Sequence, residues 1–209
     1  MHKNILILIF GIITFILIAG CADTTQQIQP TAPTVSLLTT TSASEFTYKN
    51  PSSSSVNTKE IEKAIYRLTN NERKNAGLSA LEWNEMLAVI AREHSIDMAK
   101  NGFFSHINLR GEGPNERAAH YGYPIEKTRP NEGVYMIGIA ENIGEMPTGD
   151  VIGIGYVQRG PDSIAEAQVK SWMGSFGHRS NILNSEYDVI GVGVAYDGSL
   201  YYISTQNFQ

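Results

Sequence analysis

The stretch Trp172–Ala195, WMGSFGHRSNILNSEYDVIGVGVA, contains the part of the chain that decides the fold. At its end the apolar side chains alternate, with Val192 and Val194 on one side of an extended segment. Alternation with a period of two predicts a β-strand. Gly191 and Gly193 leave the other face of this strand without side chains, which lets a helix pack closely. We therefore expect a strand that lies directly beneath a helix.

The chain continues beyond this strand into a second one. Asp197-Gly198 separates the two alternating segments, and this dipeptide is a strong signal for a two-residue β-hairpin. Residues 134–143, VYMIGIAENI, predict a further strand.

Apolar residues at helical spacing predict four helices, over residues 59–75, 85–100, 114–121 and 163–174. Thr58 and Asn84 can cap the first two, and Ser163 with Glu166 forms the pattern of a capping box. Helices early and strands late favour an α+β fold, with helices packed on a mostly antiparallel sheet.

Composition limits the classes of function. The chain has 209 residues and a net charge of −5, which argues against a nucleic-acid-binding surface. Its single cysteine, Cys21, excludes an intrachain disulfide. Residues 58–209 are long enough to bury a substantial core and form the expected folded domain.

The first 21 residues have the pattern of a secretory signal. Lys3 precedes the apolar run Ile5–Ala19, which is short for a membrane span. The end of the segment, IAGC, resembles a lipoprotein signal box, which implies a lipid on Cys21 and membrane attachment. The alternative is an uncleaved helical anchor; in both cases the rest of the chain lies outside the cytoplasm. Residues 22–57, rich in Ser, Thr and Pro, predict a disordered tether.

Two of the five histidines are candidates for a functional site. His2 lies in the signal, His94 lies on an apolar helix face and predicts a core residue, and His120 is expected to be exposed. His106 and His178 each follow a cluster of Gly, Phe and Ser just outside regular elements, where functional residues are frequent.

His178 is also expected to open a short helix that runs to Leu183. The dipole at a helix N-terminus disfavours the charged imidazole, and a metal ligand or general base must be neutral. Arg179 and Asn181 are expected to hydrogen-bond neighbouring loops. Spacing alone does not show whether His106 and His178 meet, because 72 residues separate them.

Four segments together resemble the CAP superfamily, also called SCP/TAPS, in its compact prokaryotic form. They are NNERKNAGLSALEWNEML (70–87), AREHSIDMAKNGFFSH (91–106), IAENI (139–143) and the opening stretch (172–195). Each is weak alone, but they occur in the family's order over about residues 61–208. The resemblance implies a three-layer α-β-α sandwich with a surface cleft.

The resemblance also implies the residues of that cleft. His106 and His178 correspond to the family's two site histidines, and Glu141 corresponds to its first glutamate. The second glutamate is replaced by Ser175, and Glu116 is a possible substitute whose reach spacing does not show. Without the resemblance, Glu141 reads equally as an exposed charge at a strand end.

Three hypotheses of function remain. In the first, the cleft binds a ligand, a lipid or an envelope protein, with or without a divalent metal. In the second, His106, Glu141 and His178 hold Zn²⁺, and the domain is a peptidase or esterase. In the third, the cleft is vestigial. Ser175 lacks the Gly-x-Ser-x-Gly context and an evident acid, so a serine mechanism is weaker still.

Overall fold

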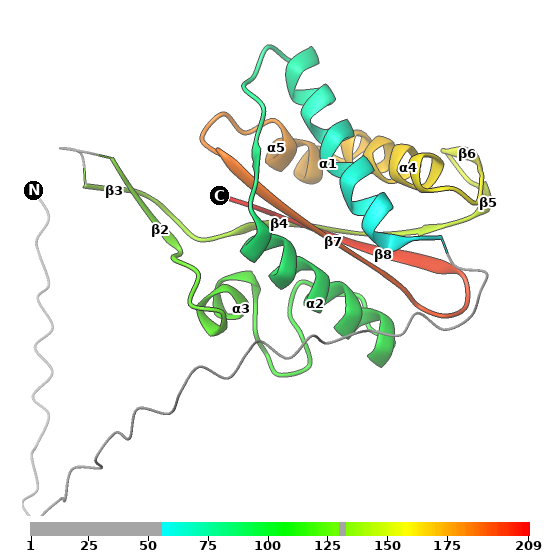
Figure 1. The fold of residues 1–209 in the computed structure, drawn as a ribbon, viewed down its shortest axis with the longest axis horizontal. Helices are drawn as coiled ribbons and strands as arrows, with labels where there is room; N and C mark the ends of the chain where they lie inside the picture. The colour runs from blue at the N-terminus through cyan, green and yellow to red at the C-terminus, as the bar shows by residue number, and fades with distance from the viewer. Residues whose placement is uncertain (1–55, 130–132) are drawn as a thin grey trace, which may run out of the picture. The chain divides into compact units, whose positions relative to one another are not determined.

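The computed structural model describes residues 56–129 and 133–209 (Figure 1). The expected signal segment, Cys21 and nearly all of the expected tether lie outside the described residues. Within the described part of the chain, no helix has both the length and the apolar character needed to cross a membrane.

A four-stranded sheet forms the middle layer. Its strand order is β1-β7-β8-β4, formed by Glu82–Trp83, Val189–Tyr196, Tyr201–Phe208 and Ala140–Pro147. Only the β1–β7 pair is parallel; β7–β8 and β8–β4 are antiparallel. Two separate hairpins pair β2 (Glu126–Arg129) with β3 (Gly133–Ile137), and β5 (Gly149–Val151) with β6 (Gly155–Val157).

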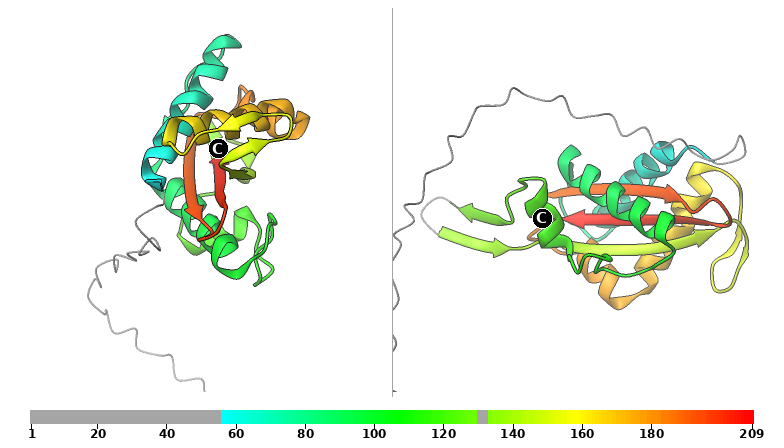
Figure 2. Two further views of the ribbon diagram at one scale, coloured as in Figure 1. Left: turned by 90° about the vertical axis from the view of Figure 1, so that its right-hand side faces the viewer. Right: turned by 90° about the horizontal axis from the view of Figure 1, so that it is seen from below.

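Helices cover both faces of this sheet (Figure 1). One face carries α1 (Thr58–Asn75), α4 (Pro161–Gly174) and α5 (Phe176–Ile182). The opposite face carries α2 (Glu85–Asn101), with α3 (Pro114–His120) beside it, and Figure 2 shows α2 lying across β7 and β8. The three-layer α-β-α sandwich with a mostly antiparallel sheet is therefore confirmed.

The glycines of β7 explain how closely α2 approaches the sheet. A Cβ atom at Gly191 would lie 2.2 Å from the backbone nitrogen of Ala88, and one at Gly193 would lie 2.0 Å from that of Arg92. Real side chains do not tolerate such distances, so the bare face of β7 is a condition for this packing. The expectation drawn from the alternating strand is confirmed.

Helix caps agree with the sequence at one helix and differ at two. The Asn84 side chain accepts from the backbone N–H of Leu87, as expected. At α1 the cap is Asn57, which accepts from Lys59, and Thr58 is already helical. The prediction of Thr58 as the cap was wrong. Asn57, directly before it, is an equally suitable N-cap residue and occupies that position.

The start of α4 also differs from expectation. The helix begins at Pro161 after Gly160, because proline is well suited to the first helical position. Ser163 lies inside the first turn and accepts from the backbone N–H of Gln158. The predicted capping box of Ser163 and Glu166 is therefore wrong.

The segment predicted as one strand over residues 134–143 forms parts of two. Gly138, with a φ of 109°, ends β3, and β4 begins at Ala140 in a different sheet. Asn115 of α3 accepts from the backbone N–H of Ile139 at this break. The break directs β4 into the main sheet, where it carries Glu141.

The outer strand β4 is attached to the α4 and α5 layer by side chains. Trp172, which is 1% exposed, donates its indole N–H to the carbonyl of Ile143. Asn181 donates to the carbonyl of Glu141. Both donors lie outside the sheet. They satisfy peptide oxygens of β4, which pairs with β8 alone among the described strands.

A buried arginine positions α5. Arg73, at the end of α1 and 1% exposed, donates to the carbonyls of Ser79, Ile182, Asn184 and Tyr187. Burial lowers the pKa of this guanidinium, and the nearby Asp188 acts in the opposite direction. The side chain joins the loop after α1 to the C-terminal end of α5, and so holds the helix that carries His178.

Candidate functional site

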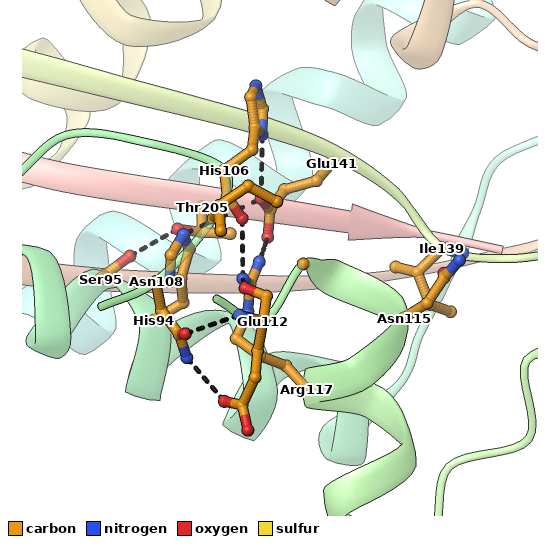
Figure 3. Close-up of polar contacts among 12 residues, drawn as sticks. His94, Ser95, His106, Asn108, Glu112, Asn115, Arg117, Ile139, Glu141 and Thr205 are labelled. Carbon is orange, nitrogen blue, oxygen red and sulfur yellow. Dashed lines mark hydrogen bonds and ion pairs between the residues drawn. The ribbon is translucent and has the colours of Figure 1, made fainter. Parts of the chain in front are cut away.

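A buried carboxylate holds His106. The loop after α2 brings His106 to β4, where its Nδ1 lies 2.9 Å from Oε1 of Glu141 (Figure 3). The Glu141 side chain is 1% exposed, whereas that of His106 is 49% exposed. A carboxylate only accepts, so Nδ1 of His106 carries the hydrogen and Nε2 is the acceptor of the neutral ring.

Arg117 of α3 holds the same pair from the other side. Its Nη2 donates to Oε2 of Glu141, and its Nη1 donates to the carbonyl of His106 at 2.8 Å (Figure 3). The arginine side chain is only 6% exposed. Arg117 therefore fixes both the carboxylate that orients the imidazole and the backbone that carries it.

The loop that carries His106 is shaped by its own side chains. Asn108 is buried, and its Oδ1 accepts from the backbone N–H groups of Arg110 and Glu112. Its amide donates to the carboxylate of Glu112. Local bonds of this kind favour a fixed turn over regular structure, so His106 stands on a defined loop.

His94 is a further neighbour of Glu141. It lies fully buried on α2, with its Nε2 3.0 Å from the carbonyl of Ser105 and 3.9 Å from Oε1 of Glu141. Burial lowers its pKa, although Glu141 acts in the opposite direction. The expectation of a buried core histidine is confirmed, and this histidine also adjoins the site.

His178 approaches from the opposite layer. Neighbouring residues of a strand point to opposite faces, so Glu141 and Asn142 of β4 face different helical layers. Glu141 faces His106, while the amide of Asn142 donates to the carbonyl of His178. The outer strand β4 thus separates the two segments that carry the histidines.

The two histidines are close enough to influence each other. Burial lowers the pKa of His178, and the charge of His106 lowers it further. A short helix forms here as expected, but it begins at Phe176 and ends at Ile182, so His178 lies in its first turn and does not open it. Burial and the charge of His106 both favour the neutral imidazole in the half-buried side chain of His178.

The donor set does not fit a zinc site with three protein ligands. Both oxygens of Glu141 already accept, one from His106 and one from Arg117. Across residues 56–129 and 133–209, no group of three or more His, Cys, Asp and Glu side chains is arranged to hold a metal. A catalytic zinc needs three such ligands and an open position, so only the two imidazoles remain as donors here.

Other residues considered from the sequence have different positions. Glu116 accepts from the backbone N–H of Gly113 at the start of α3, where it caps the helix. Ser175 lies at the junction of α4 and α5. Asn181 bonds to strand β4, whereas a bond to a neighbouring loop had been expected. Arg179 is exposed and makes no side-chain hydrogen bond within the described residues. The loop-fixing arginine is Arg73 instead.

Sequence reasoning missed Arg117 and Asn142. Arg117 lies in the polar segment NERAAH, which reads as a solvent-facing helix, and its partner Glu141 is 24 residues away. The only available signal was Ala118 beside it, which indicates a buried face. Asn142 directly follows Glu141 and is fully buried.

Three exposed apolar side chains lie close to the two histidines in the sequence. Phe104 and Ile107 flank His106 in its loop and are 46% and 51% exposed, and Phe176, at the start of α5, is 81% exposed. Exposed apolar side chains that form one contiguous patch are typical of surfaces that bind another molecule. These three residues are called the apolar rim below.

The chain belongs to the Cysteine-rich secretory protein (CAP) family, whose family model matches residues 66–208. Two curated proteins of Bacillus subtilis (strain 168) are similar over 147 residues, 70% of this chain. The membrane protein YlbC is 37% identical, and the protein YkwD is 33% identical. The chain spans only 34% and 46% of their lengths.

Solved structures agree with this assignment. An extracellular protein with an SCP domain from Bacillus anthracis is 28% identical, with a TM-score of 0.53 over 72% of this chain and 40% of that one. An outer surface protein of Borrelia burgdorferi is 22% identical, with a TM-score of 0.54 over 73% and 94%, and it shows the shared fold. The CAP fold and the prokaryotic form are therefore established.

Proposed function

We propose that the chain is an extracytoplasmic binding module whose ligand occupies the surface between His106 and His178. One observation carries the proposal: a half-exposed imidazole is fixed by a buried ion pair, and exposed apolar residues lie next to both histidines in the sequence. A side chain with a fixed ring orientation loses little conformational freedom when a ligand binds. The ligand class is a small molecule, a lipid or an envelope protein with a hydrogen-bond donor and an apolar part.

The location outside the cytoplasm rests on two supports. Lys3, the apolar run Ile5–Ala19 and Cys21 have the order of a lipoprotein signal. YlbC is named a membrane protein, and the structural relative from Bacillus anthracis is an extracellular protein. Cys21→Ser tests the anchor: we expect the protein to move from the membrane fraction to the medium. Full retention in the membrane would favour an uncleaved helix.

Site-specific photocrosslinking tests the binding surface directly. A photoreactive phenylalanine replaces Phe176 in the apolar rim, and Leu200, also exposed, serves as the control position. Strand register places Leu200 at the end of the sheet opposite Glu141, because β8 pairs Tyr201 with Pro147 and Asn207 with Glu141. The probe is activated in intact cells that export the protein.

We expect a defined adduct from position 176 and none from position 200. The adduct should be lost in the double variant His106→Ala, His178→Ala, provided that this variant keeps its far-ultraviolet circular dichroism spectrum. Equal adducts from both positions, or an adduct that survives the double substitution, would contradict the proposal.

A zinc-dependent hydrolase remains the alternative. It requires Glu141 to release Arg117 or His106 and become a ligand, which the contacts oppose. We expect only weak Zn²⁺ binding in calorimetry, through the two imidazoles, because metal ligation needs neutral imidazoles and a third ligand is lacking. Tight binding that is lost in Glu141→Gln, together with hydrolysis that a chelator abolishes, would favour the enzyme.

A further inference from the structure

The tip of the β5–β6 hairpin exposes two large apolar side chains. Ile152, in the turn, is 102% exposed, and Tyr156, on β6, is 71% exposed. We propose that this tip is a membrane contact: Ile152 and Tyr156 enter the surface of the lipid bilayer at which the chain is anchored. The inference goes beyond the surface at His106 and His178, and it rests on the proposed anchoring of the chain at Cys21.

The conformation of the turn does not explain the isoleucine. The backbone N–H of Ile154 donates to the carbonyl of Val151 at 3.1 Å, so Ile152 and Gly153 are the central residues of a β-turn. Gly153 has a φ of 78°, as the second central residue of a type II turn does. The first central position accepts most residues, and proline or polar residues are usual in turns. The turn therefore does not require an apolar side chain at position 152.

The rest of the hairpin is fixed to the domain. Val151 and Ile154 pack against the main core cluster, to which the buried Val157 belongs. Lys170 of α4 donates to the carbonyl of Ile154 at 3.0 Å. The residues on either side of the tip are thus attached to the core, while Ile152 stays in solvent. A tip that is held in place loses little conformational freedom when it enters another phase.

The hairpin lies at the end of the sheet where the predicted tether joins the domain. β5 begins at Gly149, directly after β4 ends at Pro147. Val56 donates its backbone N–H to the hydroxyl of Tyr202, whose partner on β4 is Met146. The start of α1 and the β5–β6 hairpin therefore lie at one end of the sheet, and the β2–β3 hairpin lies at the other (Figure 1). A tether that enters at Val56 keeps the end with the exposed tip nearer to the point of attachment.

The length of the predicted tether makes a weak contact sufficient. Cys21 precedes Val56 by 35 residues in the sequence. A flexible chain of this length has a root-mean-square end-to-end distance of about 30–40 Å. Attachment over such a distance gives an effective concentration on the order of millimolar, so two side chains at a tip contribute measurable binding. An anchor combined with a second contact holds a protein at a membrane more firmly than the anchor alone.

The charge beside the tip favours an apolar contact over an electrostatic one. Asp150 is exposed and lies directly opposite Tyr156 in the hairpin. This carboxylate offers no attraction to anionic headgroups. Tyrosine is frequent at membrane–water interfaces, because its ring is apolar and its hydroxyl stays in water. We therefore expect the tip to contact neutral phosphatidylcholine as well as anionic lipid.

Vesicles that carry the protein on Cys21 test this proposal. The three core clusters lie between Ile61 and Phe208, so residues 21–209 contain all of them. Cys21 is the only cysteine, so a maleimide lipid couples the chain at the position of the proposed lipid. The vesicles consist of phosphatidylcholine, with or without phosphatidylglycerol. Part of the lipid carries bromine on its acyl chains, which quenches the fluorescence of tryptophan that enters the bilayer.

A tryptophan at the tip reports the contact. Ile152→Trp is compared with Val134→Trp, because Val134 is exposed on the β2–β3 hairpin at the other end of the sheet. The emission of the wild type, from Trp83 and Trp172, is subtracted. We expect brominated lipid to quench Ile152→Trp and to shift its emission to shorter wavelength, with both lipid compositions and in high salt. Val134→Trp should stay unquenched.

A further variant tests the isoleucine itself. Tyr156→Trp places the reporter beside Ile152, and Ile152→Ser is then added to it. Both positions are exposed, so we expect both variants to keep the far-ultraviolet circular dichroism spectrum of the wild type. Loss of the apolar side chain should lower the ratio of membrane-bound to free tips about tenfold, measured by quenching at position 156.

Three results would overturn the proposal: equal quenching at positions 152 and 134, quenching at position 156 that survives Ile152→Ser, or quenching that high salt or neutral lipid abolishes. An emission shift of Ile152→Trp that grows with protein concentration in the absence of vesicles would assign the tip to contacts between copies instead. Because the coupling is chemical, none of these outcomes depends on whether the cell attaches a lipid to Cys21. Fractionation of Cys21→Ser tests the anchor separately, and crosslinking at Phe176 tests the surface at the histidines.

Discussion

The guanidinium of Arg117 and the carboxylate of Glu141 form an ion pair that is almost fully excluded from water. Burial of two charges is costly, and their attraction offsets this cost only when the remaining hydrogen-bonding positions are also filled. Here His106 donates to the second carboxylate oxygen, and Nη1 of the arginine donates to two backbone carbonyls. The orientation of an exposed imidazole is therefore determined by a charge pair beneath the surface.

Removal of the carboxylate charge should destabilise the protein strongly. Glu141→Gln leaves the buried Arg117 without a counter-charge, and we expect the free energy of unfolding to fall by about 3–5 kcal/mol. Urea denaturation followed by tryptophan fluorescence measures the change. Glu60→Gln, on the exposed side of α1, is the matched control and should cost less than about 0.5 kcal/mol.

The double variant Glu141→Gln, Arg117→Met tests whether the unpaired charge of Arg117 causes the loss of stability. It removes both charges, so we expect it to be more stable than Glu141→Gln alone. If its loss of unfolding free energy equalled the sum of the losses in Glu141→Gln and Arg117→Met, the ion pair would not be the cause.

The second prediction concerns Arg73 and its four backbone carbonyls. A lysine has three donors on one nitrogen and cannot reproduce the planar fork, so Arg73→Lys should cost about 2–4 kcal/mol. The nuclear magnetic resonance signals of the His178 ring should broaden or shift, because α5 loses the hydrogen bonds that hold its C-terminal end. Arg67→Lys, in an exposed pair with Asp162, should cost less than about 1 kcal/mol. An Arg73→Lys protein as stable as the wild type would show that the carbonyls are readily solvated.

The third prediction concerns two glycines in different surroundings. Gly193→Ala places a methyl group against the backbone of α2, so we expect a loss of about 3 kcal/mol or a failure to fold. Gly177→Ala, in α5, meets nothing within 4 Å and should raise stability by up to about 1 kcal/mol. Thermal denaturation of both variants measures this difference. Equal effects would mean that α2 can move away from β7.

The fourth prediction concerns pH. Burial lowers the pKa of His94 and of His178 from the ordinary value of 6.5. The unfolded chain therefore binds more protons than the folded one as the pH falls below that value, and stability decreases until the folded-state pKa values are passed. We expect full stability above about pH 7 and a slope of at most about 1.4 kcal/mol per pH unit for each histidine below it.

Urea denaturation at several pH values between about pH 7.5 and pH 5 gives this slope. His94→Phe should flatten the slope, because the more buried of the two rings no longer titrates. A wild-type protein that becomes more stable on acidification would contradict the assignment of neutral histidines.

The layers of the fold could be predicted from the sequence because two local features indicate them directly. The alternation around Val192 and Val194 shows a strand, and Gly191 with Gly193 shows where a helix must approach. Boundaries were less certain: Asn57 and Thr58 are both good caps, and only the packed structure selects the first. Gly138 could equally end a strand or lie within one, and tertiary contacts with Asn115 decide.

The candidate site was predicted in part. His106 and His178 were singled out by their positions just outside regular elements, and Glu141 came from the resemblance. The structure brings His106 into contact with Glu141. Arg117 could not be predicted, because a charged residue in a polar helix reads as solvated until its partner on β4 is known. The function of these residues stays a prediction, which the crosslinking and the zinc calorimetry address.

The bonds that Trp172 and Asn181 make to β4 have a consequence for how copies of this protein meet one another. A strand at the border of a sheet is a template on which a foreign chain can add, and such addition begins polymerisation. Here the oxygens of Ile143 and Glu141 are already engaged by side chains from the flanking layer. Copies crowded together at high local density are thus less able to join border to border and aggregate.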